Sequence, residues 1–150
     1  IQSMVLKSTK GTAQRCIVKQ FKNLESYPSI ENHSVELKSL SSSERGLWAE
    51  KIVHDFLVSK KWILISERQK YKYGEIDFIF QREQKVAIIE VKYLHNPWMS
   101  FQRLSNEQLL RLKNNFLNLR QTKFKSYDVK LFLCFVDRNQ RIEWVNLADY

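Results

Sequence analysis

Residues 73–93, YGEIDFIFQREQKVAIIEVKY, decide the fold of this chain. Two apolar runs rich in Ile, Val and Phe predict strands at 75–80 and 85–92. The polar residues 81–84 between the runs predict a turn. The stretch therefore predicts an antiparallel hairpin, and the rest of the chain is analysed outward from it.

The hairpin carries three charged residues, Asp77, Glu90 and Lys92, inside apolar strands, where burying a charge costs free energy. Side chains alternate across a strand, so Glu90 and Lys92 share one face. A turn symmetric about residues 83 and 84 places Asp77 opposite Glu90 and Glu75 opposite Lys92. Cross-strand Cβ atoms lie roughly 4.5–5.5 Å apart, a separation at which two carboxylates can share one divalent cation. The alternative is a surface ion-pair network that adds little stability. We favour the metal site, because spacing, alternation and register agree.

An Asp followed about a dozen positions later by Glu-x-Lys resembles the signature of PD-(D/E)xK nucleases. The longer pattern, GEID at 74–77 followed by IIEVKY at 88–93, is similar to the YraN-like family, small bacterial proteins that resemble Holliday-junction resolvases. The resemblance covers residues 44–150. It implies an α/β fold with a restriction-endonuclease-like core: a helix, a three-stranded meander, a second helix and two further strands in one mixed sheet. It also implies a metal-dependent nuclease site.

For that site the resemblance and the chemistry of phosphodiester hydrolysis give each residue a role. Asp77 and Glu90, with the backbone carbonyl of Val91, are expected to bind Mg²⁺ or Mn²⁺, and all three charged residues are expected to be catalytic. Lys92 would orient water, stabilise developing charge or act as a base. Glu50, four residues after Gly46 in the family's helix pattern, is expected to support the metal; the alternative is an ordinary solvated helix glutamate.

Two positions depart from the family pattern and affect expected substrate contacts. Leu94 stands where a basic residue is usual, and Gln108 stands where a helix lysine is common. Neither position belongs to the carboxylate core.

The remaining elements are predicted from capping boxes and apolar periodicity. Ser41 with Glu44 begins a helix at about 42–59, and Ser105 with Gln108 begins a second one. Further strands are expected at 62–67, 127–136 and 141–145, with a basic, aromatic connection at 68–73. Residues 1–40 form a basic extension and linker, and 41–150 form the nuclease-like domain. The acid-free start also resembles a transit peptide, but a partly ordered tail is preferred.

Composition points to a polyanionic partner. The 150 residues carry a formal charge of +9, and 43% are hydrophobic, enough for one folded domain. Basic and aromatic side chains near the hairpin and the second helix are the expected nucleic-acid contacts, with DNA preferred to RNA: Lys70, Lys72, Tyr73, Arg103 and Arg111. No apolar run is long enough to span a bilayer, and Cys16 and Cys134 have no metal-binding spacing. A reducing, cytoplasmic location is expected, with Cys134 a buried thiol.

Together these patterns predict a divalent-metal-dependent endonuclease that hydrolyses nucleic acid, with structured or branched DNA as the expected substrate. A homodimer fits on symmetry grounds, because a branched junction offers two equivalent strands. The alternatives are a catalytically silent nucleic-acid-binding module of the same fold, and a structural protein that uses the basic N-terminal extension.

Overall fold

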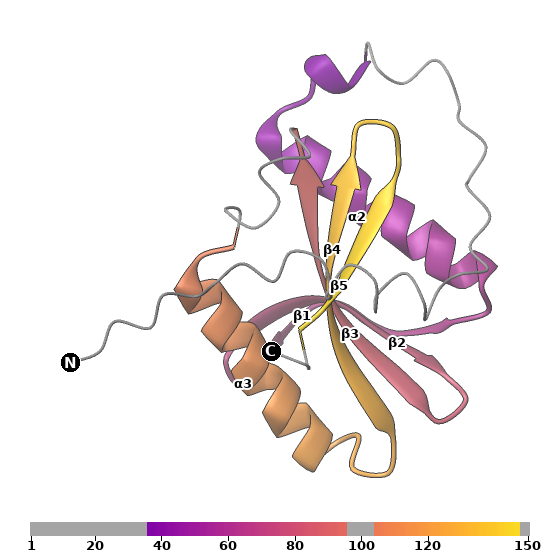
Figure 1. Cartoon of the computed structure of the whole chain (residues 1–150), viewed down its shortest axis with the longest axis vertical. Helices are drawn as coiled ribbons and strands as arrows, with labels where there is room; N and C mark the ends of the chain where they lie inside the picture. Colours follow the sequence, from indigo (N-terminus) through magenta and orange to yellow (C-terminus); the bar gives the residue numbers. More distant parts are fainter. Residues whose placement is uncertain (1–35, 96–103, 148–150) are drawn as a thin grey trace, which may run out of the picture.

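The computed structural model describes residues 36–95 and 104–147, which fold into one five-stranded sheet and two long helices (Figure 1). The elements in chain order are η1 (Glu36–Lys38), α2 (Ser42–Ser59), β1 (Ile63–Tyr71), β2 (Gly74–Arg82), β3 (Lys85–Leu94), α3 (Asn106–Gln121), β4 (Asp128–Asp137) and β5 (Ile142–Asn146). This is the predicted order of helix, three strands, helix and two strands.

The sheet is mixed, as predicted. Its strands lie in the order β1-β2-β3-β4-β5. β3 and β4 are parallel, and every other neighbouring pair is antiparallel. A parallel connection needs a crossover, and α3 supplies it between β3 and β4. The α/β fold class is therefore confirmed.

The two helices cover opposite faces of the sheet (Figure 1). On one face, the α3-side cluster packs Leu112, Phe116 and Leu119 against sheet residues that include Ile79 and Ile88. On the other, the α2-side cluster packs helix residues such as Val53 and Phe56 against the alternate residues of the same strands. Burial on both faces explains why β3 and β4 read as nearly continuous apolar runs.

Both helices begin at the predicted capping boxes. The Ser41 side chain accepts from the backbone of Glu44, and the Glu44 side chain accepts from the backbone of Ser41. Ser105 and Gln108 make the same reciprocal contacts at α3. The bounds predicted for α2 are confirmed. Leu47 is 49% exposed, and the buried residues of this helix are Ala49, Val53, Phe56 and Leu57.

The first strand is longer than predicted. Residues 68–71, expected to be a connection, continue β1 and pair with β2 through Gln69↔Ile76, Lys70↔Glu75 and Tyr71↔Gly74. Their polar composition misled the prediction. β1 is an edge strand and its residues 67–70 are exposed, so apolar side chains are not required there.

The turn between β1 and β2 is fastened to α3 by one buried amide. The side chain of Asn115 accepts from the backbone of Tyr73 at 2.9 Å and donates to the carbonyl of Gly74 at 3.2 Å. Gly74 has a left-handed φ of 129°, and an added Cβ would lie 3.3 Å from the Arg111 guanidinium. The turn therefore needs both the glycine and the asparagine.

Asn115→Ala should lower the free energy of unfolding by about 1–3 kcal/mol, because it leaves two backbone groups of the turn without their partner. Chemical denaturation measures the loss. Asn114→Ala, one position earlier on α3, is the matched control and should cost clearly less. Equal losses for the two variants would contradict the clamp.

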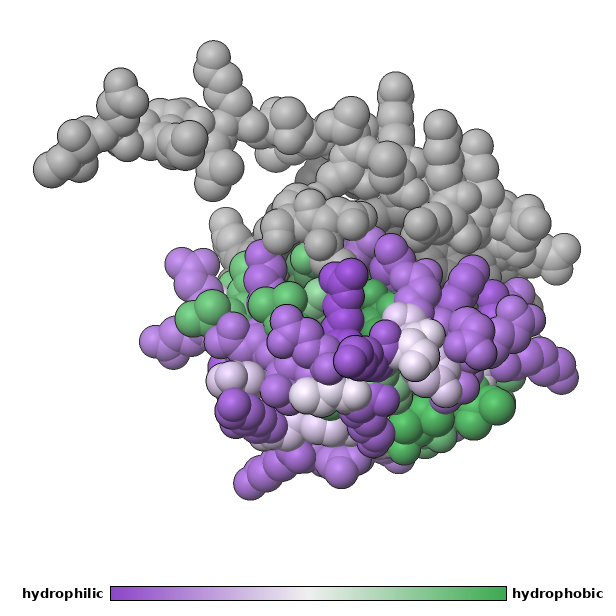
Figure 2. All heavy atoms as spheres, turned by 90° about the horizontal axis from the view of Figure 1, so that it is seen from below, coloured by the Kyte–Doolittle hydropathy of each residue, from purple (hydrophilic) through white to green (hydrophobic). Residues whose placement is uncertain are grey.

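Further expectations from the sequence concern the cysteines, the linker and membrane-spanning segments. Cys134 is fully buried, as predicted. Leu37 of η1, near the end of the expected linker, is 5% exposed. Residues 1–35, including Cys16, lie outside the described ranges. No helix in those ranges is long and apolar enough to cross a membrane. Figure 2 shows one face on which hydrophilic side chains dominate and apolar ones form separate patches.

Candidate active site

The hairpin of β2 and β3 has the predicted register. Paired positions run from Phe78↔Ile89 to Arg82↔Lys85. Asp77 and Glu90 are the next positions in this register, just beyond Phe78↔Ile89, the last pair of the ladder. The two carboxylates thus lie where the hairpin stops pairing regularly.

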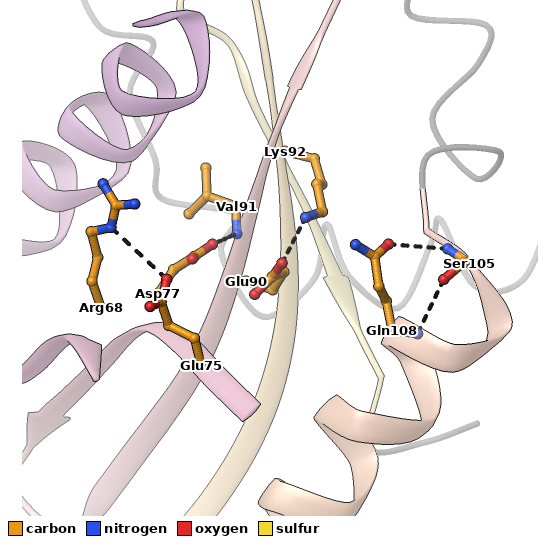
Figure 3. Close-up of polar contacts among 8 residues, drawn as sticks. All are labelled: Arg68, Glu75, Asp77, Glu90, Val91, Lys92, Ser105 and Gln108. Carbon is orange, nitrogen blue, oxygen red and sulfur yellow. Dashed lines mark hydrogen bonds and ion pairs between the residues drawn. The ribbon is translucent and has the colours of Figure 1, made fainter. Parts of the chain in front are cut away.

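The alternation of side chains breaks at Asp77. Ile76 packs in the α3-side cluster, whereas Phe78 packs in the α2-side cluster. Residues two apart in a regular strand share one face, so the backbone of β2 is irregular between them. The Asp77 carboxylate is placed against β3 and accepts a hydrogen bond of 2.8 Å from the Val91 N–H (Figure 3). A side chain thereby satisfies a backbone donor of the sheet.

Glu90 and Lys92 form a close ion pair on β3. The Lys92 amine donates to Glu90 Oε1 at 2.6 Å, and the side chains are 23% and 11% exposed respectively. Figure 3 shows the pair on one side of the Asp77–Val91 contact, with Arg68 and Glu75 on the other side in this view. The prediction that Glu90 and Lys92 share a face is confirmed.

The Asp77 carboxyl has a strongly perturbed pKa. Burial, followed by the negative charge of Glu90, raises its pKa to about 7, against an ordinary value of 3.8. The Val91 hydrogen bond and the Lys92 charge oppose the shift but do not cancel it. The two carboxylates are therefore within electrostatic reach of each other, and Asp77 lacks sufficient compensating positive charge.

Glu50 of α2 shares a cavity with Asp77. The cavity has a volume of about 400 Å³ and is lined by Ser42, Ser43, Arg45, Gly46, Leu47, Glu50, Arg68, Asp77, Val91, Lys92, Tyr93 and His95. Burial, and then the charge of Asp77, raises the pKa of Glu50. The helix glutamate is thus oriented toward the site and is not simply solvated.

Family comparison agrees with this geometry. Residues 49–145, more than half of the chain, match the protein family described as "Uncharacterised protein family UPF0102", also known as the YraN family. The chain belongs to this family. UPF0102 is a PD-(D/E)xK nuclease-like family, so the resemblance inferred from GEID and IIEVKY is confirmed.

Individual UPF0102 proteins resemble the chain over about half to three quarters of its length. A UPF0102 protein of Prochlorococcus marinus (strain MIT 9303) is 28% identical over 119 residues, which cover 73% of this chain and 94% of the relative. One from Dictyoglomus thermophilum is 22% identical over 116 residues, covering 73% and 98%. A third, from Granulibacter bethesdensis, is 34% identical over 74 residues, about half of each chain.

Four of the five predicted nucleic-acid contacts of this UPF0102 chain come together. Lys70, Lys72 and Tyr73 lie at the β1–β2 turn, where the Lys72 amine is 5.3 Å from the centre of the Tyr73 ring. Arg111 of α3 packs against Gly74 of the same turn. The fifth, Arg103, lies outside the described residues. A basic and aromatic surface, which we call the turn patch (Lys70, Lys72, Tyr73 and Arg111), therefore joins the hairpin to α3.

The cavity also brings in side chains that are not among the predicted site residues. Arg45 of α2 lies with its guanidinium 5.8 Å from the centre of the Tyr93 ring, and both line the cavity. Arg68 lies across from Asp77 on β1, and His95 lies just after β3. The pairing of β1 with β2 brings Arg68 to the cavity, and the packing of α2 on the sheet brings Arg45, whereas His95 follows Lys92 by three positions in the sequence.

Gln108, the departure from the usual helix lysine, has a structural role here. Its side chain accepts from the Ser105 backbone and completes the cap of α3. Among the residues that the structure describes, Lys92 of β3 is the lysine that lines the cavity.

The oxygen donors of the site suit a hard divalent cation. Asp77 and Glu90 are carboxylates close enough for the negative charge of Glu90 to raise the pKa of Asp77, after the larger effect of burial. Within residues 36–95 and 104–147, no group of three or more His, Cys, Asp or Glu side chains is arranged to hold a metal. Mg²⁺ commonly uses one or two carboxylates and keeps several waters, so a pair of donors is sufficient.

Asp77→Asn should stabilise the metal-free protein at pH 8 by about 2–4 kcal/mol, because one pKa unit corresponds to about 1.4 kcal/mol. The folded pKa, about 7, lies above the unfolded value of 3.8, so the folded state binds more protons between them. Wild-type stability therefore falls as pH rises through this window, and the advantage of Asn should vanish below about pH 4.

Thermal unfolding at a series of pH values, with EDTA, measures this advantage. Asp55→Asn is the control with opposite sign: a hydrogen bond from Lys51 lowers the pKa of Asp55, so its replacement should not stabilise at neutral pH. An Asp77→Asn variant that is less stable than wild type at pH 8 would contradict the proposed charge deficit.

Proposed function

We propose that this UPF0102 protein is a Mg²⁺- or Mn²⁺-dependent endonuclease that hydrolyses phosphodiester bonds, with structured or branched DNA as its substrate. One observation carries the proposal: a half-buried Asp77, with a pKa raised by burial and by Glu90, lines a cavity beside the Glu90–Lys92 pair. Perturbed carboxyl groups of this kind are concentrated at functional sites.

Asp77 and Glu90 would hold the cation with the Val91 carbonyl, and Glu50 would support it from the facing wall of the cavity. A divalent cation would neutralise charge on the phosphate and lower the pKa of a bound water. Lys92 contributes the fixed positive charge of the site, next to the phosphate oxygens where negative charge grows during hydrolysis. The Val91 N–H holds the Asp77 carboxylate in place for its role as a ligand.

The turn patch supports nucleic acid as the substrate class. Its basic side chains suit backbone phosphates, and the Tyr73 ring, 37% exposed, offers a surface for an unpaired base. Unpaired bases occur at branches and single-stranded ends, which favours structured DNA over a plain duplex. A homodimer would offer one such site to each of two strands.

The second candidate is a nucleic-acid-binding module without turnover. The observation that favours it is the Glu90–Lys92 contact at 2.6 Å, in which the lysine already neutralises one of the two proposed ligands. In this case the pair stabilises the fold, and the turn patch alone provides the function.

A cleavage assay with the Asp77→Asn and Lys92→Ala variants separates the two candidates. Linear, single-stranded and branched DNA are incubated with wild type and each variant in Mg²⁺, Mn²⁺ or EDTA. Each variant should lower metal-dependent cleavage by at least about a hundredfold, a loss typical of removing one group that stabilises the transition state. Calorimetry with Mn²⁺ should show weaker metal binding for Asp77→Asn and nearly unchanged binding for Lys92→Ala.

DNA binding in EDTA serves as the control for folding, and should persist in both variants. It should tighten slightly in Asp77→Asn, because one carboxylate no longer repels the phosphate. Wild-type protein that binds DNA, takes up no metal and cuts nothing would favour the binding module. Cleavage that survives Asp77→Asn, in preparations free of contaminating nuclease, would exclude the assigned site.

The turn patch makes a separate prediction about salt. The logarithm of the DNA association constant should fall linearly with the logarithm of salt concentration, and Lys70→Glu/Lys72→Glu should flatten the slope by about 1–2. Fluorescence anisotropy at several salt concentrations measures both slopes. Lys51→Glu/Lys60→Glu makes the same change in net charge on α2 and its C-cap, and should leave the slope nearly unchanged. Equal effects of the two double variants would indicate that DNA binding depends on the overall charge of the protein and not on the turn patch.

A further inference from the structure

The backbone of Arg68 has an unusual conformation for its place in the fold. Its φ is 46°, in the left-handed region that L-residues other than Asn and Asp rarely adopt. Three other non-glycine residues in the described ranges share a positive φ: Lys61 just after α2, Glu83 in the β2–β3 turn and Gln140 between β4 and β5. Those three lie in turns, where such angles are ordinary. Arg68 lies inside a strand.

The strand register places this residue directly across from the active-site aspartate. β1 and β2 pair at Glu67↔Phe78 and again at Gln69↔Ile76, and the position between them joins Arg68 to Asp77. That position is absent from the paired register. The irregularity that redirects Asp77 on β2 is therefore matched by a left-handed residue on β1. Local irregularities in paired strands re-aim side chains and are common beside active sites.

The Arg68 side chain lines the same cavity as Asp77, Glu50 and Lys92, whereas Glu90 is not among the lining residues. Burial and the charge of Asp77 raise the pKa of Glu50, and the positive charge of Arg68 opposes that rise. The ion pair of Arg68 with Glu75 is long at 3.9 Å, and the two side chains are 50% and 43% exposed. Exposed pairs of this length contribute little to stability, so stability does not explain the position.

We propose that Arg68 is a substrate-binding residue that contacts a backbone phosphate of the nucleic-acid strand in this cavity. The inference rests on the proposed function and adds a contact on the opposite side of Asp77 from Lys92. A guanidinium presents two parallel N–H donors that match two phosphate oxygens. The long, exposed contact with Glu75 does not take the place of such a phosphate. The left-handed backbone is the cost of directing this fork into the cavity, and strain of this kind is concentrated at functional sites.

The proposal predicts that stability and binding change in opposite directions. Glycine and asparagine both tolerate a left-handed φ. Arg68→Gly and Arg68→Asn should therefore melt at or above the wild-type temperature, while they bind DNA about tenfold more weakly. Their log–log salt slope should fall by about 0.9, the value for one lost phosphate contact. Arg68→Lys keeps the charge without the fork and should lie between wild type and these variants.

Lys61→Gly is a matched control. Lys61 has a φ of 65°, carries the same charge, and does not line the cavity. Its replacement should relieve the same backbone conformation and remove one positive charge, yet change DNA affinity less than twofold. The two glycine variants thus separate loss of a specific contact from loss of net charge.

Affinity is measured by anisotropy with fluorescein-labelled single-stranded and four-way-junction DNA in EDTA, so that binding is observed without cleavage; melting and Mg²⁺-dependent cleavage are measured in parallel. Weaker binding by Arg68→Gly and Arg68→Asn but not by Lys61→Gly supports the phosphate contact. If wild type binds and cuts DNA while the Arg68 variants bind like Lys61→Gly, the inference fails and the proposed function stands. If wild type neither binds nor cuts any of these substrates, the proposed function fails, and the inference fails with it.

Discussion

The hydrogen bond between the Asp77 carboxylate and the Val91 N–H is the contact on which the site depends. It lies where the β2–β3 ladder ends and where the side chains of β2 change faces. A backbone donor at this depth needs an acceptor, and the carboxylate supplies it in place of a strand carbonyl. The same bond fixes a negative charge beside Glu90. One hydrogen bond thus satisfies a backbone donor of the sheet and positions a carboxylate of the candidate site.

The placement of Asp77 beside Glu90 lowers the stability of the metal-free protein near neutral pH. Burial and a neighbouring carboxylate raise the pKa of Asp77, so the protein is strained electrostatically near neutral pH unless a cation or a proton compensates. On β1, the left-handed backbone of Arg68 adds conformational strain at the position facing Asp77. Both features are unfavourable for folding alone, and their coincidence at one cavity is the reason to assign them to function.

The two sides of the site are held differently. The hairpin and α3 are joined by the Asn115 side chain, which hydrogen-bonds to the backbone of Tyr73 and Gly74 at the β1–β2 turn. The opposite wall, α2, packs through apolar residues and presents Glu50 and Arg45 to the cavity. A rigid hairpin between two helices can therefore place the turn patch and the cavity at fixed positions relative to the carboxylates.

The sequence by itself determined the parts that local chemistry controls. Capping boxes fixed where both helices begin, alternation fixed which residues of β3 share a face, and the symmetric turn fixed the register from Phe78↔Ile89 to Arg82↔Lys85. Tertiary structure alone decided the rest. The polar half of β1 became a strand because β2 offered a partner, whereas its own residues carried no strand signal. Arg68 lies at the site because its position on β1 is across from Asp77 on β2. The two strands do not pair at this position, although they pair on both sides of it. Register between neighbouring strands and strain at a single φ depend on contacts that no local pattern encodes.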